Sequence, residues 1–238
     1  MINELLTIVF IDITHLIFYK LKTIKKYTIT DFKNYTITDF KKYLSTTSKL
    51  RWFYIHSITN FIISYYSLND IYECIRNMNI CYKIPWNISS YKIFYLSFIL
   101  HIYHCLFFEL SQADYLHHFL MVFICGPLCY TQKTIISSFA LFFLTGLPGA
   151  IDYLLLYLVK LNMIKSITEK KIYTYISFFI RSPGCILTSG IGLPGLIEYN
   201  KTNDIFNFIT TLSLVTLTYW NGQYYLMKSH ESYLRNKP

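Results

Sequence analysis

Charged side chains are scarce in this chain of 238 residues: Asp, Glu, Lys and Arg make up 15% of it, against about a quarter in an ordinary soluble domain. Hydrophobic residues make up 53%, which disfavours a soluble globular fold. The mean hydropathy of +0.34 is modest, but the chain holds 23 Tyr, and hydropathy scales score tyrosine as nearly polar although its ring readily occupies a membrane interface. The composition therefore indicates a membrane protein.

The chain also lacks a regular cysteine pattern. It has six cysteines with no CxxC pair, so neither a zinc site nor a disulfide framework is indicated. Most of them fall inside apolar segments. Only Cys74 and Cys81 share a connection between two such segments, and a disulfide can form there.

Seven apolar segments come near the length of about 20 residues that crosses a bilayer. The first has no basic region before it and no small-residue cleavage site, so we interpret it as a retained span and not as a signal peptide. We predict an all-α, polytopic transmembrane bundle of about seven spans; six remains open because the first, second and fourth segments are short. The segments are Leu5–Tyr19, Trp52–Leu68, Ile93–Leu110, Tyr115–Tyr130, Ile135–Val159, Ile172–Leu193 and Ile205–Met227.

Two of these segments contain helix-breaking residues. The fifth carries Gly146-Leu147-Pro148-Gly149 near its middle, and the sixth carries Pro183-Gly184. A proline inside a helix removes one backbone hydrogen bond and clashes with the preceding turn. We therefore expect a kinked or broken helix at both places.

The basic residues set the orientation. The net charge is +9, but Lys and Arg lie between apolar stretches and form no face with aromatic stacking positions, which disfavours nucleic acid as a partner. Most of them fall in the first long loop, in the fifth connection and in the tail, and cytoplasmic loops retain such an excess. The N-terminus is thus predicted outside, with the first loop and the C-terminus in the cytoplasm.

The first long loop contains a tandem duplication, Tyr27–Asn34 followed by Tyr35–Lys42, to which we assign no function. Two copies of eight residues are too few to build a solenoid. We divide the chain into residues 1–49, with the first span and the basic loop, a membrane domain at 50–228, and a short basic tail at 229–238.

Ionisable side chains within spans are costly, and they are the default functional candidates. The richest group straddles the third and fourth spans. On a helix, two histidines three residues apart share a face, and an acid three or four residues before a histidine lies next to it. A carboxylate could thus orient one imidazole for general acid–base chemistry. The group consists of His101, His104, Glu109, Asp114, His117 and His118.

Two other interpretations of this group remain open. Asp114 could cap the fourth helix while the histidines bond to neighbouring spans. Histidine pairs on facing helices can also bind iron or zinc. Membrane di-iron oxygenases use several histidine boxes, however, and of the seven histidines here His15, His56 and His230 lie in other segments. We therefore predict no metal and no cofactor.

A second polar pair lies at the breaks of the fifth and sixth spans. Asp152 follows the first break and Arg181 precedes the second. An acid and a base on adjacent helices could pair across the bundle, which would remove the penalty of burying either alone. The pair would then fix the packing, or it would form a polar site beside unwound backbone, as in transporters.

These features together resemble the TLC-domain family, which includes ceramide synthases and other lipid-related proteins. The double histidine His117-His118 opens a span, a kinked acidic span follows, Arg181 stands in the next, and the last span ends in a run containing Trp220. The likeness covers roughly residues 50–228. It implies one extra helix before a six-helix core, His117 and His118 as acyl-transfer residues, and a location in the endoplasmic reticulum.

The chain departs from the ceramide synthase pattern in two places. Phe119, Leu120 and Met121 stand where those enzymes continue the double histidine with a threonine, and only Asp152 stands near their second, acidic region. Family members that lack the complete motif sense, move or organise lipids.

Two functions follow from these observations. The first is non-catalytic lipid handling, in which the bundle encloses a lipid-sized cavity and membrane lipids are the partners. The second is an acyl-CoA-dependent N-acyltransferase acting on a long-chain amine, with His117 or His118 as general base and Asp152 assisting. The two differ in whether His117, His118 and Asp152 face one enclosed cavity. A solute transporter would show repeat symmetry between the two halves, which this sequence lacks.

Overall fold

The computed structural model describes residues 1–24 and 37–237. Nearly all of these residues lie in helices, and they contain no β-strand beyond one isolated bridge between Pro85 and Thr134. The predicted all-α fold is confirmed.

The helices join into continuous stretches that overlap the seven predicted segments. Some stretches contain a π-helical turn, labelled η3 to η5, between two α-helices, and η2 (Cys81–Lys83) is a short 3-10 turn. The stretches are α1 (Ile2–Ile24), α2 (Ile37–Arg76), α3 (Ile88–Phe107), α4–η3–α5 (Gln112–His118, Phe119–Cys125, Gly126–Gln132), α6–η4–α7 (Ile135–Leu141, Phe142–Gly146, Leu147–Lys160), α8–η5–α9 (Ser166–Ile176, Ser177–Arg181, Ser182–Lys201) and α10 (Ile205–Asn236).

Three of these stretches are long and apolar enough to cross a membrane. They run over Ile2–Tyr19, Ile135–Lys160 and Ser166–Lys201. The other stretches carry more polar residues. α2, for example, contains Asn60 and Asp70. The chain is therefore a membrane protein of helical architecture.

Besides a buried apolar core, the helices bury many polar side chains and expose many large apolar ones, which is unusual for a soluble protein. Asp12, Arg51, Asn60 and Asp70 are buried, whereas Phe10 and many other large apolar side chains of the helices are exposed. An apolar exterior is favourable against lipid tails and unfavourable against water. This distribution supports the same conclusion independently of helix length.

The first long loop is shorter than the sequence predicts. α1 continues to Ile24 and α2 begins at Ile37, so part of the basic segment before Trp52 is helical. The first copy of the duplication, Tyr27–Asn34, lies outside the described residues, and the second, Tyr35–Lys42, begins outside them and continues into α2. α2 and α10 also run without interruption through the boundaries drawn at 49/50 and 228/229.

The helices predicted to kink or break stay continuous. Each π-helical turn is followed by a helix with proline in its first two positions: η3 by Pro127, η4 by Pro148 and η5 by Pro183. Proline has no N–H and its ring clashes with the carbonyl four residues earlier. A π turn widens the helix at that point, so the chain accommodates proline without leaving the helical path.

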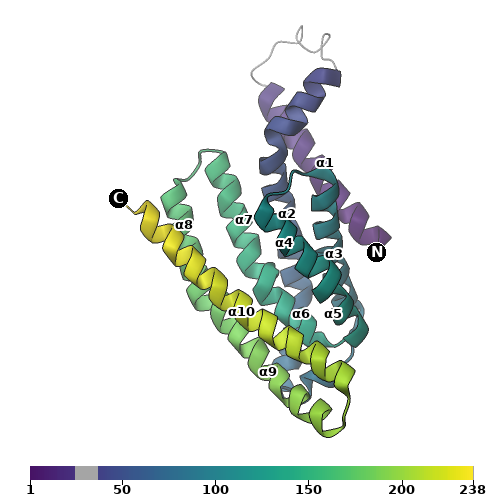
Figure 1. Ribbon diagram of the computed structural model, residues 1–238. Coiled ribbons are helices and arrows are strands. Elements are labelled where there is room, and N and C mark those ends of the chain that lie inside the picture. Colours follow the sequence, from purple (N-terminus) through teal and green to yellow (C-terminus); the bar gives the residue numbers. More distant parts are fainter. Residues whose placement is uncertain (25–36, 238) are drawn as a thin grey trace.

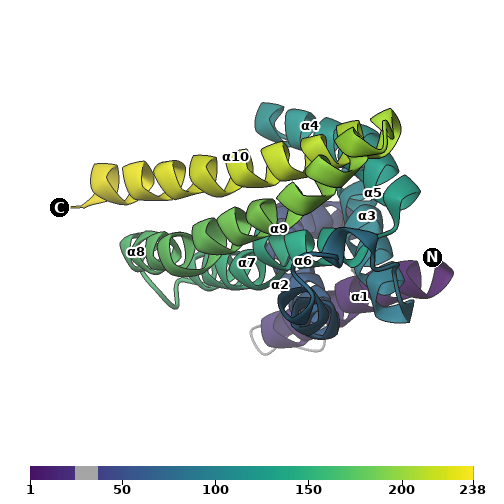
Figure 2. The same ribbon diagram turned by 90° about the horizontal axis from the view of Figure 1, so that it is seen from below.

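α2 packs against α1, α3, α6 and α7. α9 and α10 run side by side along one face, and α1 lies on the opposite face, as both views show (Figures 1 and 2). α10 also contacts α8, η5, α5 and η4. It therefore forms an outer wall, whereas α2 has neighbours on most sides and leaves Tyr65, Leu68 and Tyr72 exposed.

Small and polar residues hold α2 against α6–α7. The Ser57 hydroxyl donates to the Ala150 carbonyl at 2.9 Å, and the Thr145 hydroxyl donates to the Asn60 amide oxygen at 3.2 Å. Gly149 packs so closely on Asn60 that a Cβ there would lie 2.9 Å from its amide nitrogen. Close approach at small residues, supported by hydrogen bonds between helices, is typical of packing in membranes.

One end of the bundle is braced covalently. Cys74, near the end of α2, forms a disulfide with Cys81 of η2, and both are buried. The indole N–H of Trp86 donates to the Thr134 carbonyl at 2.8 Å. These contacts tie the α2–α3 connection to the start of α6.

Candidate functional site

Four histidines of α3 and α4 meet inside the bundle as two pairs. His101 Nε2 lies 3.0 Å from His117 Nε2, and His118 Nε2 lies 2.8 Å from His104 Nδ1. His101 and His104 share a face of α3, as their spacing predicts, and α4 brings consecutive histidines against them. His101, His104 and His118 are buried, and His117 is half-buried.

A fifth histidine, His56 of α2, joins this cluster and was not predicted. Its ring centre lies 6.5 Å from that of His101. The Tyr153 ring stacks on His56 with ring centres 4.0 Å apart, and Trp52 stacks on His104 at 3.5 Å. Aromatic rings of α2 and α7 thus fix the orientation of the imidazoles, because stacked rings have little freedom to turn.

Asp114 caps its own helix and does not orient a histidine. Ser111 is the N-cap residue of α4, and Asp114 forms a capping box with it. The Asp114 carboxylate accepts from the Ser111 amide at 2.8 Å and from the Ser111 hydroxyl at 2.7 Å. Within the described residues it makes no hydrogen bond to His117 or His118. The capping interpretation is confirmed, and the carboxylate–imidazole interpretation is wrong.

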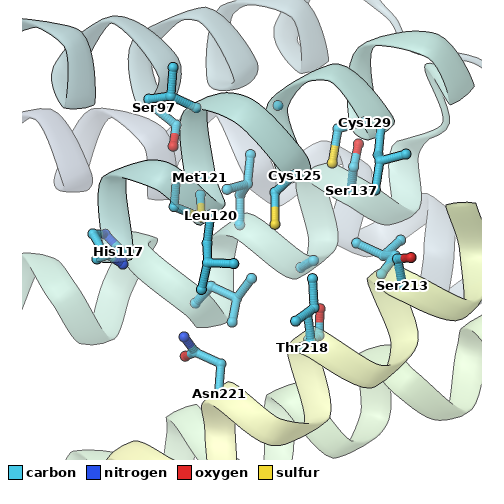
Figure 3. A pocket seen from close by; sticks show the side chains of 18 of the residues that line it. Ser97, His117, Leu120, Met121, Cys125, Cys129, Ser137, Ser213, Thr218 and Asn221 are labelled. Carbon is cyan, nitrogen blue, oxygen red and sulfur yellow. The ribbon is translucent and has the colours of Figure 1, made fainter. Parts of the chain in front are cut away.

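A cavity of about 220 Å³ adjoins the cluster, between α3, α4–η3–α5, α6 and α10. Its walls are mainly apolar, as at Leu120 and Leu217. Figure 3 shows His117 at one end of it and Asn221 of α10 facing the same space. At about 10–15 Å³ of cavity volume for each water molecule, it has room for more than ten waters or for part of a lipid chain.

The three predicted catalytic residues do not share this cavity. His117 lines it together with His101. His118 is turned toward His104, with its Nδ1 buried and without a partner. Asp152 lies on α7, away from the lining. The arrangement therefore places one imidazole of the double histidine, and not the proposed catalytic set, beside the cavity.

Arg181 does not pair with Asp152. Its Nη1 donates to the Tyr173 hydroxyl at 2.7 Å, its Nη2 donates to the Asn221 amide oxygen at 2.9 Å, and its guanidinium carbon lies 4.0 Å from the centre of the Tyr225 ring. The predicted ion pair is absent from the described residues. Arg181 instead links η5 to α10, next to the cavity, because α10 packs along α9 and brings Asn221 within reach.

A buried ion pair lies elsewhere in the described part of the bundle, and the sequence analysis missed it. Arg51 Nε donates to Asp12 Oδ1 at 2.9 Å, and a second guanidinium nitrogen bonds the other carboxylate oxygen. The Tyr103 hydroxyl donates to Asp12 Oδ2 at 2.7 Å. An acid inside the first apolar span was the available signal, since such a residue requires a partner.

No group of three or more His, Cys, Asp or Glu side chains is arranged to hold a metal ion in the part of the chain that the structure describes. The fold and the site define an all-α membrane protein with a histidine-lined cavity between its helices. No protein-family profile, curated protein or solved structure matches the chain.

Proposed function

We propose that this protein is a seven-span membrane protein that binds part of a lipid in the cavity between α3, α4–η3–α5, α6 and α10. The observation that carries the proposal is the cavity itself: mainly apolar walls, within a helical membrane protein, with a small polar end at His117 and Asn221. Ligand sites combine apolar walls with few polar groups in this way. The partners would be membrane lipids.

The seven-span arrangement is supported by the helix order and by the disulfide. Each predicted segment overlaps a continuous helical stretch. The Cys74–Cys81 disulfide closes the connection that the charge distribution assigns to the lumenal side, where disulfides persist. One helix before six others is also the layout that the resemblance to the TLC-domain family implies, and with it a location in the endoplasmic reticulum.

This topology predicts that the two ends of the chain lie on opposite sides of the membrane. A tag placed after Pro238 should be cleaved when protease is added to sealed, right-side-out endoplasmic-reticulum vesicles, whereas a tag before Met1 should be cleaved only after detergent is added. Tags protected on the same side would contradict an odd number of spans.

Filling the cavity is expected to remove lipid binding. Leu217 lines the cavity and Leu212, on the same helix, is exposed outside it. Leu217→Trp should reduce the lipid that co-purifies with the protein to about a tenth or less, because an indole occupies the space that the hydrocarbon chain of the lipid needs. Leu212→Trp, the matched control, should leave it unchanged. If both variants retain the same amount of lipid, the proposal that the cavity binds lipid is contradicted.

The acyltransferase alternative has weaker support, because only His117 of its three residues reaches the cavity. It makes a distinct prediction. Membranes that contain the wild-type protein would accumulate N-acylated long-chain bases, and those with the His117→Ala/His118→Ala double variant at equal expression would not. Lipid analysis of the two membranes decides it, and we expect no difference between them.

A further inference from the structure

The hydrogen bonds of His101 determine which of its nitrogens carries a proton. His101 Nδ1 lies 2.6 Å from the Ser97 carbonyl oxygen. A carbonyl oxygen only accepts, so Nδ1 must be the donor. The other nitrogen of His101, Nε2, faces His117 Nε2 at 3.0 Å.

The membrane environment favours the neutral form of both His101 and His117. Neither forms an ion pair with an acidic side chain within the described ranges, and an unpaired charge at bilayer depth is costly. A neutral imidazole has one donor and one acceptor nitrogen. His101 Nε2 is therefore the acceptor, His117 Nε2 donates to it, and His117 Nδ1 is left as a lone pair beside the cavity.

Asn221 presents the opposite character to the same space. Arg181 has donors only, so the contact at 2.9 Å from its Nη2 requires the amide oxygen of Asn221 on that side. The amide N–H₂ of Asn221 makes no hydrogen bond among the described residues and is available to a ligand. Figure 3 shows the Asn221 side chain directed into the region that His117 borders.

We propose that this end of the cavity selects a lipid whose head is an uncharged hydroxyl group. The inference rests on the proposed lipid binding and names the class of lipid. A hydroxyl both donates and accepts, so it can donate to His117 Nδ1 and accept from Asn221. An ether and a carboxylate can only accept, so both leave the lone pair of His117 without a donor, and a quaternary ammonium head has no donor either and lies near the positive charge of Arg181.

The test uses two photoreactive probes on the purified full-length protein in lipid nanodiscs. Both have a 16-carbon chain with a diazirine, one ending in a hydroxyl and the other in a methyl ether. Labelled cavity residues are identified by mass spectrometry, and each probe is competed with unlabelled hexadecanol, hexadecyl methyl ether, hexadecanoate or hexadecyltrimethylammonium. Hexadecanol should compete about tenfold better than the other three, because they leave a buried polar group of the cavity unpaired.

Three variants assign the preference to the named groups. His117→Phe should bring the alcohol-to-ether ratio close to one. Asn221→Leu should weaken both competitors and leave their ratio unchanged, because both can accept from the lost amide. His230→Phe is the matched control and should change nothing, since His230 is exposed on α10 and does not line the cavity. The ratio is measured within one preparation, so partial loss of folded protein does not imitate the effect.

The outcomes separate the two proposals. If both probes label cavity residues and the alcohol and ether compete equally, the hydroxyl preference is overturned and lipid binding stands. If neither probe labels the cavity, lipid binding is overturned and the inference with it. Labelling of the cavity with the tenfold preference, lost in His117→Phe, supports both.

Discussion

Replacing Arg51 with alanine is expected to lower the free energy of unfolding by about 3–5 kcal/mol, the usual cost of removing one partner of a buried ion pair. The substitution leaves the Asp12 carboxylate buried with only the Tyr103 hydroxyl as a partner. α1, α2 and α3 meet at this carboxylate, so their contacts should loosen together. Unfolding of the purified protein in detergent, followed by circular dichroism, measures the loss.

Two comparisons make this prediction specific. Lys83→Ala removes an ion pair with Glu198 at the surface, in which the side chains are 51% and 39% exposed, and exposed pairs contribute little. The unfolding of this variant should match that of the wild type. The double variant Asp12→Leu/Arg51→Met should recover most of the stability, because no charge is left unpaired. An Arg51→Ala variant as stable as Lys83→Ala would show that the buried pair does not hold α1 to the bundle.

Gly184→Ala is expected to destabilise the protein by about 1–3 kcal/mol or more, the range for an overfilled core. A methyl group on Gly184 of α9 would overlap the ring of Phe143 in η4. The ring is packed beside Phe139 and Phe142, so it cannot move aside without displacing them. The same detergent unfolding assay provides the measurement.

Gly190→Ala is the matched control, because it lies in the same helix and a Cβ there would meet nothing within 4 Å. It should be neutral or slightly stabilising, since alanine favours a helix more than glycine does. Phe143→Leu should relieve part of the Gly184→Ala defect in the double variant. If Gly184→Ala and Gly190→Ala have the same free energy of unfolding, the close approach of α9 to η4 does not determine which residues are tolerated at position 184.

The positions of the helices were readable from the sequence, because apolar length and the short polar connections between segments report on each segment alone. The sequence also predicted that His101 and His104 share a face of their helix, because residues three apart lie on the same side of a helix. The helix ends were less predictable. α2 begins well before its apolar portion, since polar residues outside the hydrocarbon continue a helix equally well.

Partners on distant helices could not be predicted. The sequence shows that Asp12 needs a positive partner, but not that α2 turns Arg51 toward α1. It shows that Arg181 needs an acceptor, and Asp152, the acid at the break of the adjacent span, was the natural choice. The packing of α10 determines the partner instead, because it brings the amide oxygen of Asn221 within hydrogen-bonding distance of Arg181. His56 was missed for the same reason, because α2 alone does not reveal which face meets α3.

The three π-helical turns also determine how this chain can vary in length. A π turn holds about one residue more than the α turn it replaces, so each acts as a single inserted residue that the helix absorbs. Deleting one residue at Phe119–Cys125, Phe142–Gly146 or Ser177–Arg181 would restore α-helix, and the following half would keep the same face toward its neighbours. A deletion elsewhere in these helices would instead rotate everything that follows by about 100°. At these three turns, the chain can therefore lose a residue without a change in helix rotation.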